Sequence, residues 1–204
     1  MRKFSAVILA GLMLASCSGE PVRESSKDNG SSASSEQTSK PLSGETFNPK
    51  EVAQAASVFF GGTSEGLAKA LERAIKDFGE PNAYITGEEA GGAVVVGLRY
   101  GKGVLTYKGG DSQTVYWQSP SVGWDFGGNA SKVFTLVYNL RSSGELFQRF
   151  PAVDGSLYLL AGVGMNYQRS GDVTLAPIRT GVGLRAGASV GYVHYTRTSS
   201  AIPF

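Results

Sequence analysis

The spacing of apolar residues changes near residue 82, and this change predicts two kinds of secondary structure. Over residues 46–81, apolar residues recur every three or four positions, which is typical of amphipathic helices. Beyond this point, short runs of β-branched and aromatic residues alternate with turn signals, which is typical of antiparallel strands. The pattern predicts a mainly β fold, with two amphipathic helices over 46–81 preceding a small antiparallel Gly-rich β-barrel over 82–204.

The two helices have clear start and stop signals. Asn48 can cap the first helix, with Pro49 in its first turn and Glu51 three residues after the cap. Gly61-Gly62 ends it, and a second helix begins at Thr63 or Ser64 and stops at Gly79 and Pro81. Each helix has one apolar face, which would either pack on a sheet or lie on a membrane. We expect packing on the sheet.

The predicted strands are short and separated by turns. Tyr100–Gly103 is interpreted as a tight hairpin, and Glu88-Glu89 as part of a solvated turn. Twenty of the 28 glycines follow residue 81, and glycines inside strands permit the bends that a closed barrel needs. The strand-like runs are Ala93–Arg99, Val104–Tyr107, Thr114–Gln118, Lys132–Leu140, Leu157–Met165 and Ser189–Thr196.

The N-terminus has the features of an export signal. Arg2 and Lys3 precede an apolar run, Phe4–Ala15, that is too short to span a membrane as a helix. The run ends in Leu14, Ala15, Ser16 and Cys17, which resembles a bacterial lipobox. The resemblance implies that residues 1–16 are removed as a lipoprotein signal peptide and that Cys17 carries diacylglyceryl and N-acyl lipid. The alternatives are an ordinary signal peptide with a chance cysteine, or a buried free thiol.

Residues 17–45 are then the lipidated cysteine and a flexible Ser-rich tether. The segment contains almost no large apolar residue, so it cannot bury enough surface to offset the entropy of ordering. A flexible chain of this length spans roughly 30 Å. The residue after Cys17 is Ser18, whereas an Asp at this position would resemble the retention signal of inner-membrane lipoproteins. We therefore expect a periplasm-facing lipoprotein of the outer membrane, with the choice of leaflet left open.

Composition excludes several kinds of chemistry. One Cys and one His exclude a disulfide scaffold, a zinc site built on several thiolates and a His-rich metal site. Without Arg2 and Lys3, 17 cationic side chains face 17 anionic ones, and this neutrality argues against nucleic-acid binding. No nucleotide-binding loop or G-x-S-x-G nucleophile motif is present. We expect no metal and no cofactor other than the covalent lipid.

Catalysis has few candidates. His194 alternates within a strand-like run and is interpreted as a structural histidine hydrogen-bonded to its neighbours. A pair of carboxylates could serve a cell-wall hydrolase or transferase, with Asp125 as the leading candidate. The other carboxylates that could form such a pair are Glu88, Glu89, Asp154 and Asp172. Sequence offers no test of their separation, so no catalytic residue is assigned and we expect a protein that is not an enzyme.

Charge is unevenly distributed along the predicted barrel. From Lys132 onward there are seven cationic side chains, six of them Arg, against Glu145, Asp154 and Asp172. The planar guanidinium suits phosphate or carboxylate, so an anionic lipid headgroup, a lipopolysaccharide phosphate or a peptidoglycan carboxylate would fit. Internal pairing with Asp154 and Asp172 on solvated strand faces is the alternative.

Several long blocks resemble the EipA-like envelope-integrity proteins: Gly87–Gly92, Ser121–Val133, Leu146–Pro151, Gly164–Gly171 and Ala176–Arg185. The resemblance implies a periplasmic antiparallel β-barrel in Gram-negative bacteria that supports cell-envelope integrity, with no agreed reaction. The lipobox departs from typical members, which look simply secreted. The candidate ligand-binding residues are Trp124, Asp125, Asn129, Tyr167, Arg169, Arg179 and Arg185.

These observations favour a non-enzymatic lipoprotein that supports the envelope by binding an envelope component or assembly partner. An anionic lipid-binding domain and a cell-wall hydrolase or transferase remain as alternatives.

Overall fold

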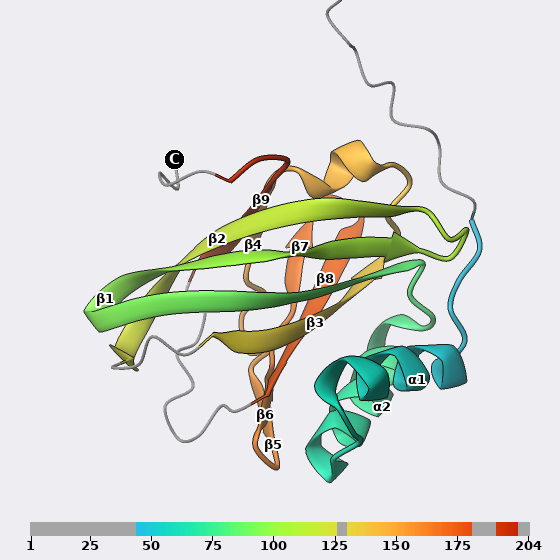
Figure 1. The fold of residues 1–204 in the computed structure, drawn as a ribbon, viewed down its shortest axis with the longest axis horizontal. Coiled ribbons are helices and arrows are strands. Elements are labelled where there is room, and N and C mark those ends of the chain that lie inside the picture. The colour runs from blue at the N-terminus through green and yellow to red at the C-terminus, as the bar shows by residue number, and fades with distance from the viewer. Residues whose placement is uncertain (1–43, 126–129, 181–190, 200–204) are drawn as a thin grey trace, which may run out of the picture. The chain divides into compact units, whose positions relative to one another are not determined.

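The computed structural model describes residues 44–125, 130–180 and 191–199, with side chains described throughout except at residues 92–96 and 121–125. Two helices precede a curled antiparallel sheet (Figure 1). The predictions for Leu14, Ala15, Ser16, Cys17 and the leader and tether lie outside the described residues. Within these ranges, no helix has the length and apolar character needed to cross a membrane.

Helix α1 (Pro49–Phe60) has the predicted capping arrangement. The Asn48 side-chain oxygen accepts hydrogen bonds from the backbone N–H groups of Lys50 and Glu51, at 3.0 and 3.1 Å. The Glu51 carboxylate in turn accepts from the Asn48 backbone N–H at 2.9 Å. The helix ends at Gly61, whose φ of 82° lies in the left-handed region that glycine tolerates.

Helix α2 (Glu65–Phe78) begins after Ser64, whose hydroxyl accepts from the Leu67 backbone N–H at 3.2 Å. Its buried face packs with Val52 and Ala56 of α1 against the outer surface of the sheet. The expectation that the helices pack on a sheet is confirmed. The buried residues of α2 are Gly66, Leu67, Ala70, Leu71 and Ala74.

The sheet has nine strands in the order β4-β9-β2-β1-β3-β8-β6-β5, and β7 also pairs with β8. All the pairings are antiparallel (Figure 1). A short 3₁₀ helix, Ser143–Leu146, follows β3. The strands are β1 (Ala83–Tyr107), β2 (Ser112–Asp125), β3 (Ser131–Tyr138), β4 (Arg149–Pro151), β5 (Tyr158–Leu160), β6 (Val163–Met165), β7 (Gln168–Ser170), β8 (Val173–Thr180) and β9 (Tyr192–Thr196).

Strand β1 doubles back on itself (Figure 1). A Cβ placed on Gly87 would lie 2.4 Å from the Lys102 carbonyl oxygen, so its two halves lie side by side. The first half pairs with β3, and the second half pairs with β2.

The predicted tight hairpin at Tyr100–Gly103 is wrong, because these residues run extended in β1 opposite β2. Gly101 is opposite Trp117, and a Cβ on Gly101 would lie only 2.0 Å from the Trp117 Cε2 atom. This glycine makes room for an indole ring and does not form a turn. The predicted run Leu157–Met165 is likewise two short strands, β5 and β6, which Ala161 and Gly162 join with positive φ angles.

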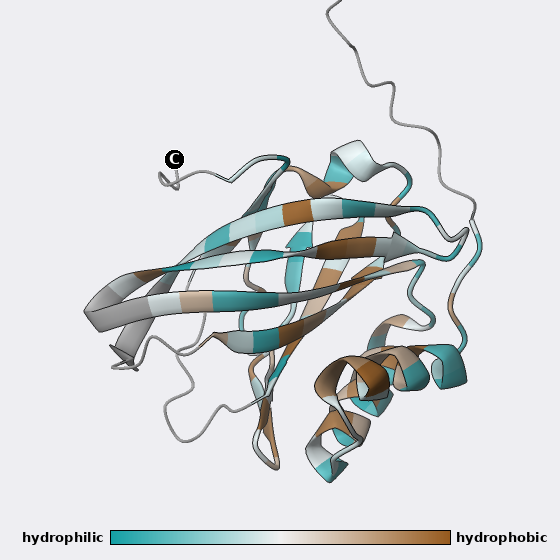
Figure 2. Ribbon diagram, viewed as in Figure 1, coloured by the Kyte–Doolittle hydropathy of each residue, from teal (hydrophilic) through white to brown (hydrophobic). Residues whose placement is uncertain are grey.

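The β4 end of the sheet approaches β7, the strand that pairs with β8 outside the main order. A bridge joins Ala152, just after β4, to Gln168 of β7, and the Val153 backbone N–H donates to the Tyr167 carbonyl at 2.9 Å. The expected β-barrel fold is confirmed. Hydropathy varies along the strands and helices in Figure 2. One core cluster fills the barrel, with Ile85, Leu105 and Val115 among its members, and a second lies beneath the helices around Phe134 and Leu136.

Candidate functional site

A charged cluster lies inside the barrel. Glu89 continues the inward-facing series of Ala83 and Ile85 and is only 4% exposed. Its Oε1 atom accepts a 2.6 Å hydrogen bond from Nε of Arg179 on β8, and Arg99 approaches the same oxygen at 3.4 Å. The interpretation of Glu89 as part of a solvated turn is therefore wrong, although its neighbour Glu88 is exposed.

The second oxygen of Glu89 is also engaged. Trp117 donates its Nε1–H to Glu89 Oε2 at 3.3 Å, and a second nitrogen of Arg179 lies 3.5 Å from the same atom. Arg179 also donates to the Asn166 side-chain oxygen at 3.1 Å. The carboxylate is thus held by two guanidinium groups and an indole.

Burial raises the pKa of Glu89, but the charge and hydrogen bond of Arg179, the charge of Arg99 and the Trp117 hydrogen bond outweigh it, so the pKa lies below its ordinary value. Glu89 is therefore an ionised acceptor at neutral pH and is a poor choice for a general acid. Among the described residues, two guanidinium groups face this one carboxylate, which leaves one positive charge in excess within the cluster.

Two further polar residues line this part of the interior. Ser119 is directly opposite Arg99 in the β1–β2 register and is 1% exposed. Its hydroxyl has no hydrogen-bond partner in the described part of the chain. Tyr195 packs near Trp117 with ring centroids 5.8 Å apart, and burial raises the pKa of its phenol.

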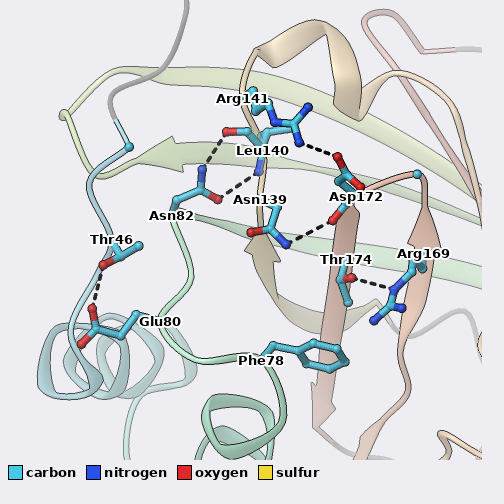
Figure 3. Close-up of a pocket in the computed structure, with 12 residues that line it drawn as sticks. Thr46, Phe78, Glu80, Asn82, Asn139, Leu140, Arg141, Arg169, Asp172 and Thr174 are labelled. Carbon is cyan, nitrogen blue, oxygen red and sulfur yellow. Dashed lines mark hydrogen bonds and ion pairs between the residues drawn. The ribbon is translucent and has the colours of Figure 1, made fainter.

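A separate groove of about 700 Å³ lies on the surface, where the chain enters the folded part (Figure 3). Asn82, just before β1, makes two hydrogen bonds to the backbone of Leu140, just after β3. Its side-chain nitrogen donates to the Leu140 carbonyl at 2.7 Å, and its side-chain oxygen accepts from the Leu140 N–H at 3.2 Å. Arg141 is ion-paired with Asp172, and the Asn139 amide donates to the Asp172 carbonyl at 3.2 Å.

Arg169 is the lining cation without a carboxylate partner among the described residues. Its Nε donates to the Thr174 hydroxyl at 3.0 Å (Figure 3), and its guanidinium carbon lies 5.7 Å from the Phe78 ring centroid. Its other N–H groups contact no acceptor in the described ranges. The Glu80 carboxylate accepts a hydrogen bond from the Thr46 hydroxyl at 2.7 Å. The groove therefore presents one fixed guanidinium with unused donors.

The structure separates the candidate residues that sequence grouped together. Arg179 lies in the barrel and Arg169 lines the groove. Tyr167 is buried beneath α2, where its hydroxyl donates to Asp77 at 2.8 Å; burial first, and then this bond, raise its pKa. The backbones of Trp124 and Asp125 in β2 pair with Val94 and Ala93 in β1. Asn129 and Arg185 lie outside the described residues.

Sequence reasoning missed Arg99, Trp117 and the position of Glu89. The alternation Ala83, Ile85, Gly87, Glu89 was the available signal, since it places the carboxylate on an apolar face. His194 does lie in a strand, but its Nδ1 has no partner among the described residues, so the expected hydrogen bond is not seen at that atom. Burial, followed by the charge of Arg149, lowers the pKa of His194. No group of metal-ligating side chains occurs in the part of the chain that is described.

Comparison with known proteins gives a family and a structural relative. The family model for envelope integrity protein A matches residues 45–204. The crystal structure of a beta-barrel-like, uncharacterized protein from Brucella abortus is 45% identical, covers 78% of this chain and 99% of its own, and superimposes with a TM-score of 0.72. No curated protein matches. The family match indicates a role in cell-envelope integrity and association with the cell envelope, and neither match gives a sign of enzymatic activity. The chain belongs to the envelope integrity protein A family.

Proposed function

We propose that this protein is a lipid-anchored, non-enzymatic protein of the periplasmic side of the outer membrane, and that it supports envelope integrity by binding an anionic envelope component in the groove. The single observation that carries the binding role is Arg169, a fixed cation with unused donors in an open polar groove. The lipobox at Leu14–Cys17 supports the anchor, and the family supports the envelope role.

The surroundings of Arg169 prepare it for an oxyanion. Thr174 holds one edge of the guanidinium, and Phe78 lies close to it. The remaining N–H groups can make the two parallel hydrogen bonds that guanidinium forms with carboxylate or phosphate. Arg141 differs because Asp172 already occupies it.

The position of the groove suits a tethered domain. Two of its lining residues lie at the domain end of the predicted tether: Gly44 within its last residues and Thr46 just after it. A component bound in the groove would therefore lie close to the domain end of the predicted tether, whose flexible chain spans roughly 30 Å from the lipidated Cys17. Binding there would join the membrane anchor to a second envelope component.

Purified mature protein carrying Cys17→Ser tests this proposal by co-sedimentation with peptidoglycan sacculi and by flotation with phosphatidylglycerol or phosphatidylcholine vesicles. We expect salt-sensitive binding to sacculi or to anionic vesicles, weakened about tenfold by Arg169→Gln, which corresponds to one charge-assisted contact of about 1.4 kcal/mol. Arg149→Gln is the matched control, because Arg149 is exposed and lies outside the groove.

The outcomes separate the alternatives. Binding to anionic vesicles alone favours the anionic lipid-binding domain, and binding to sacculi favours a cell-wall component. If Arg169→Gln binds both as the unsubstituted protein does, the groove is not the binding site. Hydrolysis of sacculi that Asp125→Asn abolishes would replace the proposal by the hydrolase alternative.

A further inference from the structure

We propose that the barrel interior contains a second binding site, separate from the groove, in which Arg99 and Ser119 hold a single oxyanion: a carboxylate or phosphate group with about one negative charge. The site lies beside the Glu89–Arg179 pair. It is independent of the groove and of Arg169.

The charge balance of the cluster, counted among the described residues, favours a further anion. Arg99 and Arg179 are both largely buried, each with 11% of its side chain exposed, and Glu89 is the one carboxylate that pairs with either among the described residues. An uncompensated buried charge is costly, and a bound anion removes that cost. One monoanion would neutralise the excess.

Arg99 is the cation whose N–H donors are mostly unused among the described residues. Its contact with Glu89 is 3.4 Å, longer than the 2.7–2.9 Å that is usual for charge-assisted bonds, whereas Arg179 takes the same oxygen at 2.6 Å. Arg179 also donates a hydrogen bond to Asn166, whereas Arg99 has no second hydrogen-bond partner in the described ranges. Most of the Arg99 N–H groups therefore remain available.

Ser119 supplies the second, independent observation. Ser119 follows Val115 and Trp117 on the inward face of β2, and Arg99 precedes Gly101, Gly103 and Leu105 on the inward face of β1. A fully buried hydroxyl without a partner is rare, because its desolvation is not compensated. An oxyanion between these opposed residues would accept hydrogen bonds from both.

The Glu89 carboxylate sets the specificity of the site. It would repel a dianion, and one negative charge is enough to balance the cluster. Carboxylates and singly charged phosphates therefore fit, whether as free ions or as the end group of a larger molecule.

Thermal unfolding of the mature Cys17→Ser protein tests this site at constant ionic strength, with sodium acetate or inorganic phosphate replacing chloride. We expect a saturable rise in Tm with at least one of the two anions. Arg99→Met should abolish this rise, and Ser119→Ala should weaken the apparent affinity about tenfold. Lys102→Met removes the same charge from an exposed residue of the same strand and should leave the rise unchanged.

The result that overturns the proposal is a Tm that does not respond to either anion, or a response that Arg99→Met and Ser119→Ala both retain. If Arg99→Met does not fold, Ser119→Ala alone decides. Arg169→Gln should keep the full response, which separates failure of this site from failure of the groove. Added octanoate distinguishes a free ion from the end group of a larger molecule. If octanoate competes with acetate, the site accepts the end group of an amphiphile; if it does not compete, the site takes free ions.

Discussion

At the scale of single residues, Trp117 belongs both to the packed core of the barrel and to its buried charged cluster. The indole lies where Gly87 and Gly101 leave space, and its Nε1–H reaches the Glu89 carboxylate. These two glycines are required because any side chain would occupy the volume of the indole. Glycine content in the strands thus serves the buried ion cluster as well as the curvature of the sheet.

Gly101→Ala should lower the free energy of unfolding by roughly 1–3 kcal/mol, since the new methyl group would overlap the Trp117 ring in a closely packed core. Urea unfolding measures the change. Gly44→Ala is the control, because a Cβ there meets no atom within 4 Å, and its effect should stay within about 0.5 kcal/mol. Equal effects of the two substitutions would contradict the packing role of Gly101.

Glu89→Gln should cost roughly 3–5 kcal/mol, since it leaves two buried guanidinium groups without their carboxylate. Glu88→Gln is the matched control on the exposed neighbour and should change the stability little. Urea unfolding at neutral pH, without phosphate or carboxylate buffers, measures both. A small effect of Glu89→Gln would show that the cluster does not need its carboxylate.

The same carboxylate predicts a dependence on pH. The pKa of Glu89 in the folded protein lies below the value of about 4.3 for an unfolded chain. Its stabilisation is therefore fully present above about pH 4.3 and is lost as the pH falls through the folded pKa. Stability measured from pH 7 downward should fall less steeply in Glu89→Gln than in Glu88→Gln. Parallel curves would contradict a depressed pKa.

At the scale of elements, the start of α1 depends on one side chain. Asn48 satisfies two backbone N–H groups, and Glu51 completes the capping box. Asn48→Ala should cost about 1 kcal/mol, as loss of an N-cap usually does, whereas Asn48→Asp should keep the cap and most of the stability. Urea unfolding compares the two variants, and equal losses would show that the cap is not the cause.

The helices were predictable because their signals are local. Asn48, Pro49 and Gly61 act within one or two turns of the residues they cap. The error at Tyr100–Gly103 has the opposite origin, since close packing against Trp117, an interaction across strands, also selects glycine. A local Gly-rich pattern does not distinguish a turn from such a contact.

At the scale of the whole molecule, the anchor is the feature with the largest expected effect on behaviour in the cell. Cys17→Ser should prevent lipid attachment and shift the protein from the membrane fraction to the soluble periplasmic fraction. Fractionation and metabolic labelling with palmitate measure this, and Ser18→Ala is the neighbouring control. Unchanged processing and fractionation in Cys17→Ser would contradict the lipobox interpretation.

Sequence by itself determined the two helices and their caps, the antiparallel barrel class that follows them and the family blocks, since each depends on local pattern or on long stretches of sequence. Only the tertiary structure decided which charged residues meet. Glu89 lies 10 residues from Arg99 and 90 from Arg179, and it contacts both because β1 doubles back and the sheet curls. Alternation along β8 places Arg179 on the inward face, whereas Arg169 on β7 lines the groove. Charge counts along a chain do not contain this information, because the partner of a buried charge is set by which strand faces lie opposite each other.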